Sequence, residues 1–168
     1  MFYVLMYLGA AIAANLIIAA TGPQWWAVGG VCLAFVAFNL TSRDRLHDAW
    51  QGRGLWRKMA LLIGAGSALS WFLNRGAGRV SLASFLAFAL AGLADTLIYH
   101  TMGNASPMMR VNLSNAGGAA VDSLVFMIVA FGWPPLWGLA LLQFVCKVGG
   151  GFVYSLCLPV DKRRCYDF

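Results

Sequence analysis

The hydrophobic positions of this 168-residue chain fall into six long runs separated by short polar connections. A helix that crosses a bilayer needs about 20 predominantly apolar residues, within a range of about 17–25. The runs approach that length: Phe2–Ala20, Trp26–Thr41, Met59–Leu73, Leu82–Tyr99, Asn112–Phe131 and Leu136–Leu158. We therefore predict an all-α, polytopic membrane protein. We expect its six transmembrane helices to form a compact bundle, and residues 1–168 to make up a single membrane domain.

Two of these runs need comment. Met59–Leu73 is short, so it must borrow flanking residues, thin the bilayer, or stop short of spanning it. The first run has no Lys or Arg before Arg43, whereas a secretory signal has a positively charged start. We therefore interpret Phe2–Ala20 as a retained transmembrane helix.

Composition supports the membrane class. Hydrophobic residues make up 61% of the chain and charged residues only 11%, whereas an ordinary soluble domain has about 25% charge. The net charge of +6 does not indicate a nucleic-acid partner, because the basic residues lie between the hydrophobic runs, where topology signals occur.

The distribution of Lys and Arg predicts the orientation of the bundle. If both termini are cytoplasmic, nine basic residues lie on the cytoplasmic side: Arg43, Arg45, Arg53, Arg57, Lys58, Arg110, Lys162, Arg163 and Arg164. Only Arg75 and Arg79 lie on the other side, where Trp25 and Trp26 mark an aromatic belt. Positive residues concentrate on the cytoplasmic side of membrane proteins, so both ends are predicted to be cytoplasmic. The connection Ser42–Lys58 is expected to lie at the headgroup interface.

The four cysteines, Cys32, Cys146, Cys157 and Cys165, show no CxxC or Cys/His spacing. The sequence therefore predicts neither a metal site nor a disulfide framework. No cofactor is predicted.

Three charged residues lie inside apolar runs: Asp95, Asp122 and Lys147. Each costs about 2.5–3.5 kcal/mol at the centre of a membrane helix before pairing. Such residues usually mark a functional interior site. The sequences "ADTLIY" and "VDSLVF", which surround the two aspartates, also hint at an inverted repeat.

Helical spacing gathers further polar and small residues on the same faces. Asn115, Gly118 and Asp122 share one face of the fifth segment, and Gln143 and Lys147 share one face of the sixth. At 1.5 Å per residue, Asp122 and Lys147 both lie near the bilayer midplane. Either the two form a pair that only fixes helix register, or they line a midplane pocket.

Small and amide residues add weaker signals. "NAGGAA" and "VGGG" allow close helix packing, and Gly149–Gly151 could also loosen the sixth helix beside Lys147. Asn15 and Asn39 either bridge helices by hydrogen bonds or belong to the site.

An enzyme is not indicated. The two aspartates differ in depth by about 8–10 Å at 1.5 Å per residue, which does not suit a proton-sharing dyad. No HExxH, Ser/His/Asp or nucleotide-binding motif is found. Polar groups at the midplane and small residues fit a transporter better.

Four motifs in order carry a family resemblance: "NLTSRDRLHDAW", "ASFLAF" followed by Asp95, "SNAGGAAVDS", and "CK" in the sixth segment. From Asn39 to Cys157, the chain resembles the queuosine-precursor transporters, also called vitamin uptake transporters. The resemblance implies uptake of 7-cyano- or 7-aminomethyl-7-deazaguanine across a bacterial-type inner membrane. The small size departs from that family and resembles a minimal or phage-encoded version, which leaves room for a changed deazapurine.

The resemblance implies a site for a planar, purine-like molecule. Asp122 would accept hydrogen bonds from its N1–H and 2-amino edge, and Lys147 and Gln143 would donate to its exocyclic oxygen or 7-substituent. Asn115 would add a second polar contact.

Four further residues complete this predicted site. Phe85 or Phe88 would stack on the ring, and Asp95 would line the cytoplasmic exit or titrate. Asn39 is the remaining candidate.

Two other functions stay open. The same fold could serve as a binding subunit that needs an ATPase partner, or the chain could be a structural, holin-like membrane protein. The sequence leaves open a homo-oligomer and the choice between passive and proton-coupled transport.

Overall fold

The computed structural model describes residues 2–36, 38, 54–102 and 106–157. These residues contain six α-helices and no strand: α1 (Phe2–Thr21), α2 (Trp25–Val31), α4 (Leu55–Leu73), α5 (Gly78–Thr101), α6 (Pro107–Phe131) and α7 (Trp137–Cys157). A π-helix, η1 (Cys32–Val36), continues α2, and a 3₁₀ turn, η2 (Arg75–Ala77), precedes α5. The predicted all-α bundle is confirmed.

The short third run, Met59–Leu73, is extended by the residues that precede it. α4 begins at Leu55 rather than Met59 and reaches 19 residues, so the helix takes its first turn from the basic connection. Most of that connection, residues 39–53, lies outside the described residues, as does the predicted site residue Asn39.

Local signals end these helices and start the next ones. Gly22 follows α1 with a φ of 68°, and Gly132 follows α6 with a φ of 99°. Glycine adopts these angles without the strain that a Cβ brings. Ser106 caps α6 by accepting a hydrogen bond from the Met109 backbone N–H, and Pro107 occupies the first helical turn.

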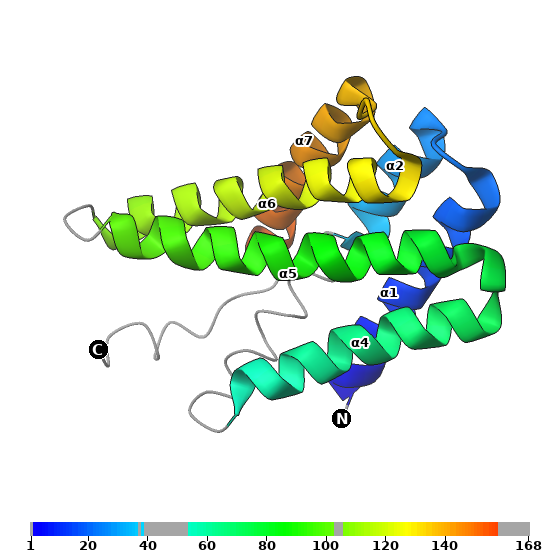
Figure 1. Ribbon diagram of the computed structural model, residues 1–168. Helices are drawn as coiled ribbons and strands as arrows, with labels where there is room; N and C mark the ends of the chain where they lie inside the picture. Colours follow the sequence, from blue (N-terminus) through cyan, green and yellow to red (C-terminus); the bar gives the residue numbers. More distant parts are fainter. Residues whose placement is uncertain (1, 37, 39–53, 103–105, 158–168) are drawn as a thin grey trace.

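The helices form a closed ring of neighbours in the order α1, α2 with η1, α7, α6, α5, α4 and back to α1. α1 also contacts α5. The closest partners are α5 and α6, which run side by side in opposite directions (Figure 1). Two glycines permit this approach, because a Cβ on Gly117 would collide with Ile98 and one on Gly118 would lie 3.2 Å from the Ala91 carbonyl oxygen. The "NAGGAA" segment therefore packs as expected.

The second glycine segment behaves differently from the first. α7 remains α-helical through Gly149–Gly151, so the loosening expected there is wrong. A Cβ on Gly149 would meet no atom within 4 Å.

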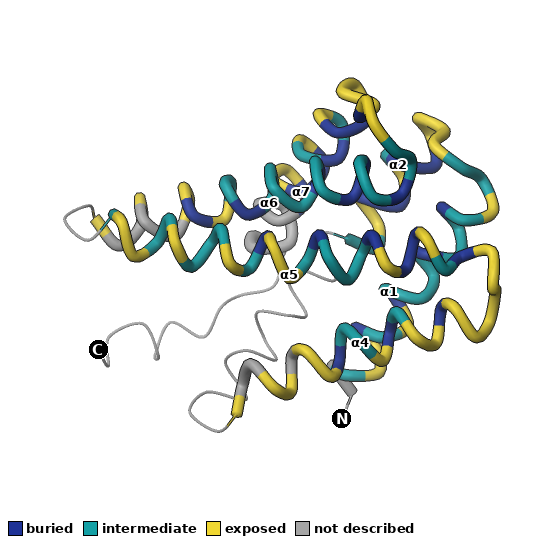
Figure 2. The backbone as a smooth tube through the Cα atoms, in the orientation of Figure 1, coloured by how far each residue is buried: buried dark blue, intermediate teal, exposed yellow. Residues whose placement is uncertain are grey.

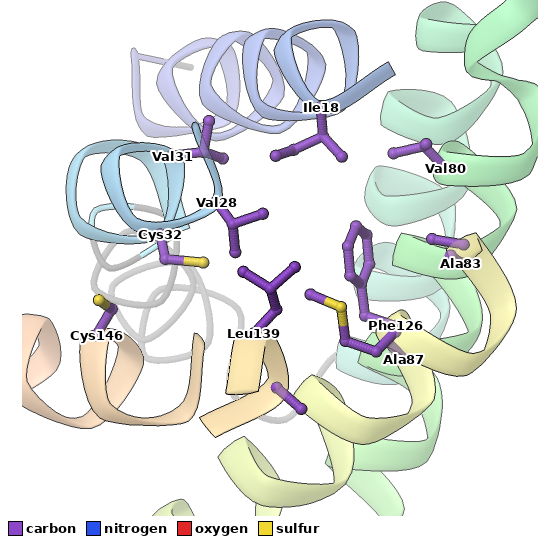
Figure 3. Packing of buried hydrophobic residues seen from close by; sticks show 13 residues of the cluster. Ile18, Val28, Val31, Cys32, Val80, Ala83, Ala87, Phe126, Leu139 and Cys146 are labelled. Carbon is purple, nitrogen blue, oxygen red and sulfur yellow. The ribbon is translucent and has the colours of Figure 1, made fainter. Parts of the chain in front are cut away.

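The main hydrophobic core lies toward one end of the bundle. It joins Ile18 at the end of α1, Val28 of α2, Ala83 near the start of α5, Phe126 near the end of α6 and Leu139 at the start of α7 (Figure 3). All of these lie near the α1–α2, α4–α5 and α6–α7 connections. In α5, no residue after Ala91 is buried (Figure 2). The main core therefore lies toward the end of the bundle that holds the α1–α2, α4–α5 and α6–α7 connections.

The outer surface is apolar. Large hydrophobic side chains are exposed along the helices, including Leu82, Leu90, Leu93 and Leu97 on one side of α5. Exposed apolar area on this scale indicates a membrane or partner surface. By length and composition, Val4–Thr21, Arg75–Thr101 and Asn112–Phe131 can each cross a membrane, and Trp25–Val36, Ala60–Leu73 and Trp137–Gly150 are shorter apolar helices.

Exposed tryptophans gather at the end of the bundle that holds the main core. Trp25, Trp26, Trp71, Trp133 and Trp137 all lie at or beside the three connections there. Tryptophan is enriched at membrane–water interfaces, so this end has the character of one boundary of the bilayer.

Candidate functional site

A charged cluster lies where α6 and α7 meet. The Lys147 ammonium (Nζ) is 2.6 Å from Asp122 Oδ2. It also donates hydrogen bonds to Ser123 Oγ at 3.3 Å and to Gln143 Oε1 at 3.4 Å. The Lys147 side chain is only 4% exposed. The pairing predicted from helix depth is thus confirmed.

Helical geometry explains why these four residues meet. Gln143 and Lys147 are four residues apart, so they lie one above the other on α7. On α6, Asp122 and Ser123 are consecutive, and Ser123 Oγ donates a hydrogen bond to the Ala119 carbonyl at 2.9 Å. This bond fixes the hydroxyl so that its lone pairs are available to the ammonium.

The hydrogen bonds of the cluster leave two groups unused. An ammonium has three donors, and Lys147 directs them to three acceptors. Among the described residues, neither Asp122 Oδ1 nor the amide nitrogen of Gln143 has a hydrogen-bond partner. The cluster therefore presents one carboxylate acceptor beside one amide donor, held in place by a saturated lysine.

Exposure rises along one face of α6. Phe126, in the core, is 8% exposed, and Asp122, about one turn away, is 21% exposed. Asn115, seven residues before Asp122, is exposed, and this spacing is about 10 Å along the axis. Asn115 is therefore not part of the Lys147 cluster, but it lies on the same face nearer the start of α6.

The other predicted site residues lie on α5. Asp95 is partly buried against Gly118, where a Cβ on that glycine would be 3.4 Å from the Asp95 Cβ. Phe88 packs with Tyr7 and Leu62 in a small second cluster between α1, α4 and α5. Phe85 is partly buried on α5.

Sequence reasoning missed two members of this region. Ser123 accepts a hydrogen bond from Lys147, and the signal for it is the Asp-Ser pair that echoes Asp95-Thr96. The second is Cys32, which is buried at the start of η1 and lies within electrostatic range of Lys147 and Asp122. π-Helices are frequent at functional sites, but this segment carries no pattern from which one could be expected.

A separate, neutral network links α1, α4 and α5. Asn15 donates to Ser70 Oγ at 3.2 Å and accepts from Ser84 Oγ at 2.6 Å. Ser70 Oγ in turn donates to the Gly66 carbonyl at 2.8 Å. Asn15 thus bridges three helices, which is the structural alternative that the sequence left open for it.

Two cavities border these elements. One, of about 440 Å³, lies among the tryptophans, between Pro23 and Trp25 on one side and Pro135 and Trp137 on the other. The other, of about 240 Å³, is an apolar groove between α6 and α7 that reaches Ser123. Neither is lined by Asp122 or Lys147.

The described residues contain no group of three or more His, Cys, Asp or Glu side chains that could hold a metal ion. Cys32 and Cys146 are both buried and unbridged.

Comparison with known proteins identifies the family to which this apolar helical bundle belongs. Residues 3–159 match the family described as "Putative vitamin uptake transporter". The chain belongs to the vitamin uptake transporter family. It is therefore an integral membrane protein of a transporter family, as the sequence motifs indicated. No curated protein and no solved structure matches the chain.

Proposed function

We propose that this vitamin uptake transporter imports a queuosine precursor, 7-cyano- or 7-aminomethyl-7-deazaguanine, across a bacterial-type inner membrane. The observation that supports the proposal is the Lys147 cluster, in which Asp122 Oδ1 and the Gln143 amide nitrogen have no hydrogen-bond partner among the described residues.

The pair of groups complements one edge of a guanine-like base. That edge presents N1–H and 2-amino donors next to a carbonyl acceptor. Asp122 Oδ1 can accept from the donors, and the Gln143 amide can donate to the carbonyl oxygen. A site built from such groups would reject molecules that lack the matching donors and acceptors, because the groups would be left unpaired when the ligand excludes water.

In this proposal Lys147 acts mainly on Asp122. Its three donors already have acceptors, so it orients the carboxylate rather than contacting the ligand. Phe85 or Phe88 would stack on the base, and of the two Phe88 already packs against Tyr7 and Leu62. Asn115 would meet the ligand on its way between Asp122 and the end of the bundle at which α6 begins.

The test is thermal unfolding of the purified protein with 7-cyano-7-deazaguanine and, as the control ligand, guanine. A ligand that binds only the folded state stabilises it by about 2.7 kcal/mol at 100 times its Kd. We expect a higher unfolding temperature with the deazaguanine, and no shift in the Asp122→Ala variant. A folded wild-type protein that shows no shift at saturating ligand would overturn this choice of substrate.

A further inference from the structure

The charged side chains that lie inside the described part of the bundle do not balance one another. Asp122 and Lys147 form an ion pair, whereas Asp95 on α5 has no ion-pair partner among the described residues. The other described lysine and arginine residues are exposed near the ends of their helices: Arg57, Lys58, Arg75 and Arg79. The described interior therefore holds two carboxyl groups and only one ammonium group.

Asp95 lies on the face of α5 that is turned toward the other helices. Ala91, one helical turn before it on the same face, is buried, and Phe88, two turns before it, packs with residues of α1 and α4. The exposed leucines of α5 lie on the opposite side of the helix: Leu82, Leu90, Leu93 and Leu97. Asp95 is therefore turned away from the side that α5 presents to lipid.

The two oxygens of the Asp95 carboxylate differ in their surroundings. Oδ1 is fully buried and has no hydrogen-bond partner among the described residues, although the side chain as a whole is partly exposed. The neighbouring Thr96 hydroxyl does not supply a donor, because it donates to the Gly92 carbonyl at 2.8 Å. The charge of a carboxylate is shared by both oxygens, so a cation that approaches the exposed side compensates the buried oxygen as well.

Asp95 borders the same face of α6 as the Lys147 cluster. A Cβ on Gly118 would be 3.4 Å from the Asp95 Cβ, and Asp122 lies four residues after Gly118 on that face. The two carboxylates are thus separated by about 6 Å along the helix axis. This separation is comparable to the reach from the pyrimidine edge of a purine-like ring to a one-carbon arm on its five-membered ring. Asn115 lies three residues before Gly118, at the level of Asp95.

The two candidate bases differ in the charge of their 7-substituent. A primary alkylamine is protonated at neutral pH, as the lysine side chain is, whereas a nitrile is neutral and only accepts hydrogen bonds. With its N1–H and 2-amino edge on Asp122, the base directs this substituent along α6 toward Asp95. An ammonium group has three donors, for which Asp95 and the amide oxygen of Asn115 supply acceptors. A nitrile offers the Asp95 carboxylate no donor.

We propose that Asp95 binds a positively charged group of the cargo, so that the 7-aminomethyl base is taken up in preference to the 7-cyano base. This inference rests on the proposed function and narrows its substrate to the cationic member of the pair. Asp95 is then the specificity-determining residue, whereas Asp122 recognises the edge that both bases share. The 7-cyano base still binds through that edge, but more weakly.

The test compares the Kd values of the two bases for the purified protein, measured by equilibrium dialysis at neutral pH. The wild type should bind 7-aminomethyl-7-deazaguanine roughly tenfold to a hundredfold more tightly than the 7-cyano base, as expected for a hydrogen bond to a charged group. Asp95→Asn keeps the size of the side chain but removes its charge, so this preference should disappear while the Kd of the 7-cyano base changes little. Thr96→Val, the control at the neighbouring position, should keep the wild-type preference.

The ratio of the two Kd values is the decisive quantity, because a purely structural role for Asp95 would weaken both bases together. Equal affinities in the wild type would refute the inference even if Asp95→Asn does not fold, and so would a ratio that survives Asp95→Asn. Either result leaves the proposed function intact, since a base still binds. If folded wild-type protein binds neither base, the proposed function fails and this inference fails with it.

Discussion

Two buried polar clusters hold this bundle together, and they use opposite chemistry. The Asn15 network, between α1, α4 and α5, is neutral and directs each described contact to another helix or to a backbone carbonyl. The cluster of Asp122 and Lys147, between α6 and α7, is charged and leaves a carboxylate oxygen and an amide nitrogen unused.

The difference distinguishes polar groups that position helices from polar groups that are available to a ligand. Hydrogen bonds between membrane helices contribute about 0.6 kcal/mol on average in one well-studied case, which suits a network that only positions helices. A buried ion pair gives little net stability, because desolvation offsets the attraction. Stability alone is therefore a weak reason for Asp122 and Lys147 to be present, and four predictions sharpen the contrast.

The largest effect is expected from Lys147→Met. This change leaves the partly buried Asp122 without its partner, and breaking a buried pair costs about 3–5 kcal/mol. Thermal unfolding in detergent should detect the loss, and the double variant Asp122→Asn/Lys147→Met should recover most of it while still failing to bind the base. A double variant that binds normally would show that the pair is only structural.

Asn15→Leu should come next. It removes the bridge between Ser70 and Ser84, and a buried hydroxyl left without its partner costs about 1–3 kcal/mol. Ser70 keeps its bond to the Gly66 carbonyl, so the loss should stay below that of Lys147→Met. Unfolding temperature should fall while the Kd for the base stays unchanged. A weakened Kd at full folding would place Asn15 in the site instead.

Gln143→Leu should weaken binding of the base, and it also removes one of the three acceptors of the Lys147 ammonium. The Asp122–Lys147 pair remains, but the amide donor for the base is lost, and a neutral hydrogen bond contributes about 0.5–1.5 kcal/mol. The Kd, measured by equilibrium dialysis, should rise by roughly three- to tenfold. An unchanged Kd would contradict the assigned contact between Gln143 and the carbonyl oxygen.

The smallest effects come from a matched pair, Ser84→Ala and Ser123→Ala. Each removes one hydroxyl, from the neutral and the charged cluster respectively, and each should lower stability by about 0.5–1.5 kcal/mol. Only Ser123→Ala should also weaken binding, because Ser123 helps to hold the Lys147 ammonium that orients Asp122. Equal effects of the two changes on the Kd would contradict the idea that only the charged cluster takes part in binding.

The sequence predicted more of the fold than of the site. The helix count and the Asp122–Lys147 pair followed from apolar run length and from residue spacing, which are local properties. The pair could be predicted because consecutive helices joined by a short connection pack together, and both residues lie at similar depth. Asn15 could not be assigned, since its role depends on Ser70 and Ser84, which are 55 and 69 residues away.

The sequence by itself therefore determined that the chain is a bundle of apolar helices carrying a few charges at depth. The physical reason is that a segment inside a bilayer must satisfy its backbone hydrogen bonds internally, as a helix does, and must present mostly apolar side chains to the lipid. Only the tertiary structure decided how those polar groups are used. The rotation of each helix set Phe88 against Tyr7, exposed Asn115 and saturated Lys147, and it left Asp95 Oδ1 without a hydrogen-bond partner in the part of the chain that the structure describes. Helix rotation follows from close packing against neighbours, at contacts such as that of Gly118 with α5, and no single segment encodes it.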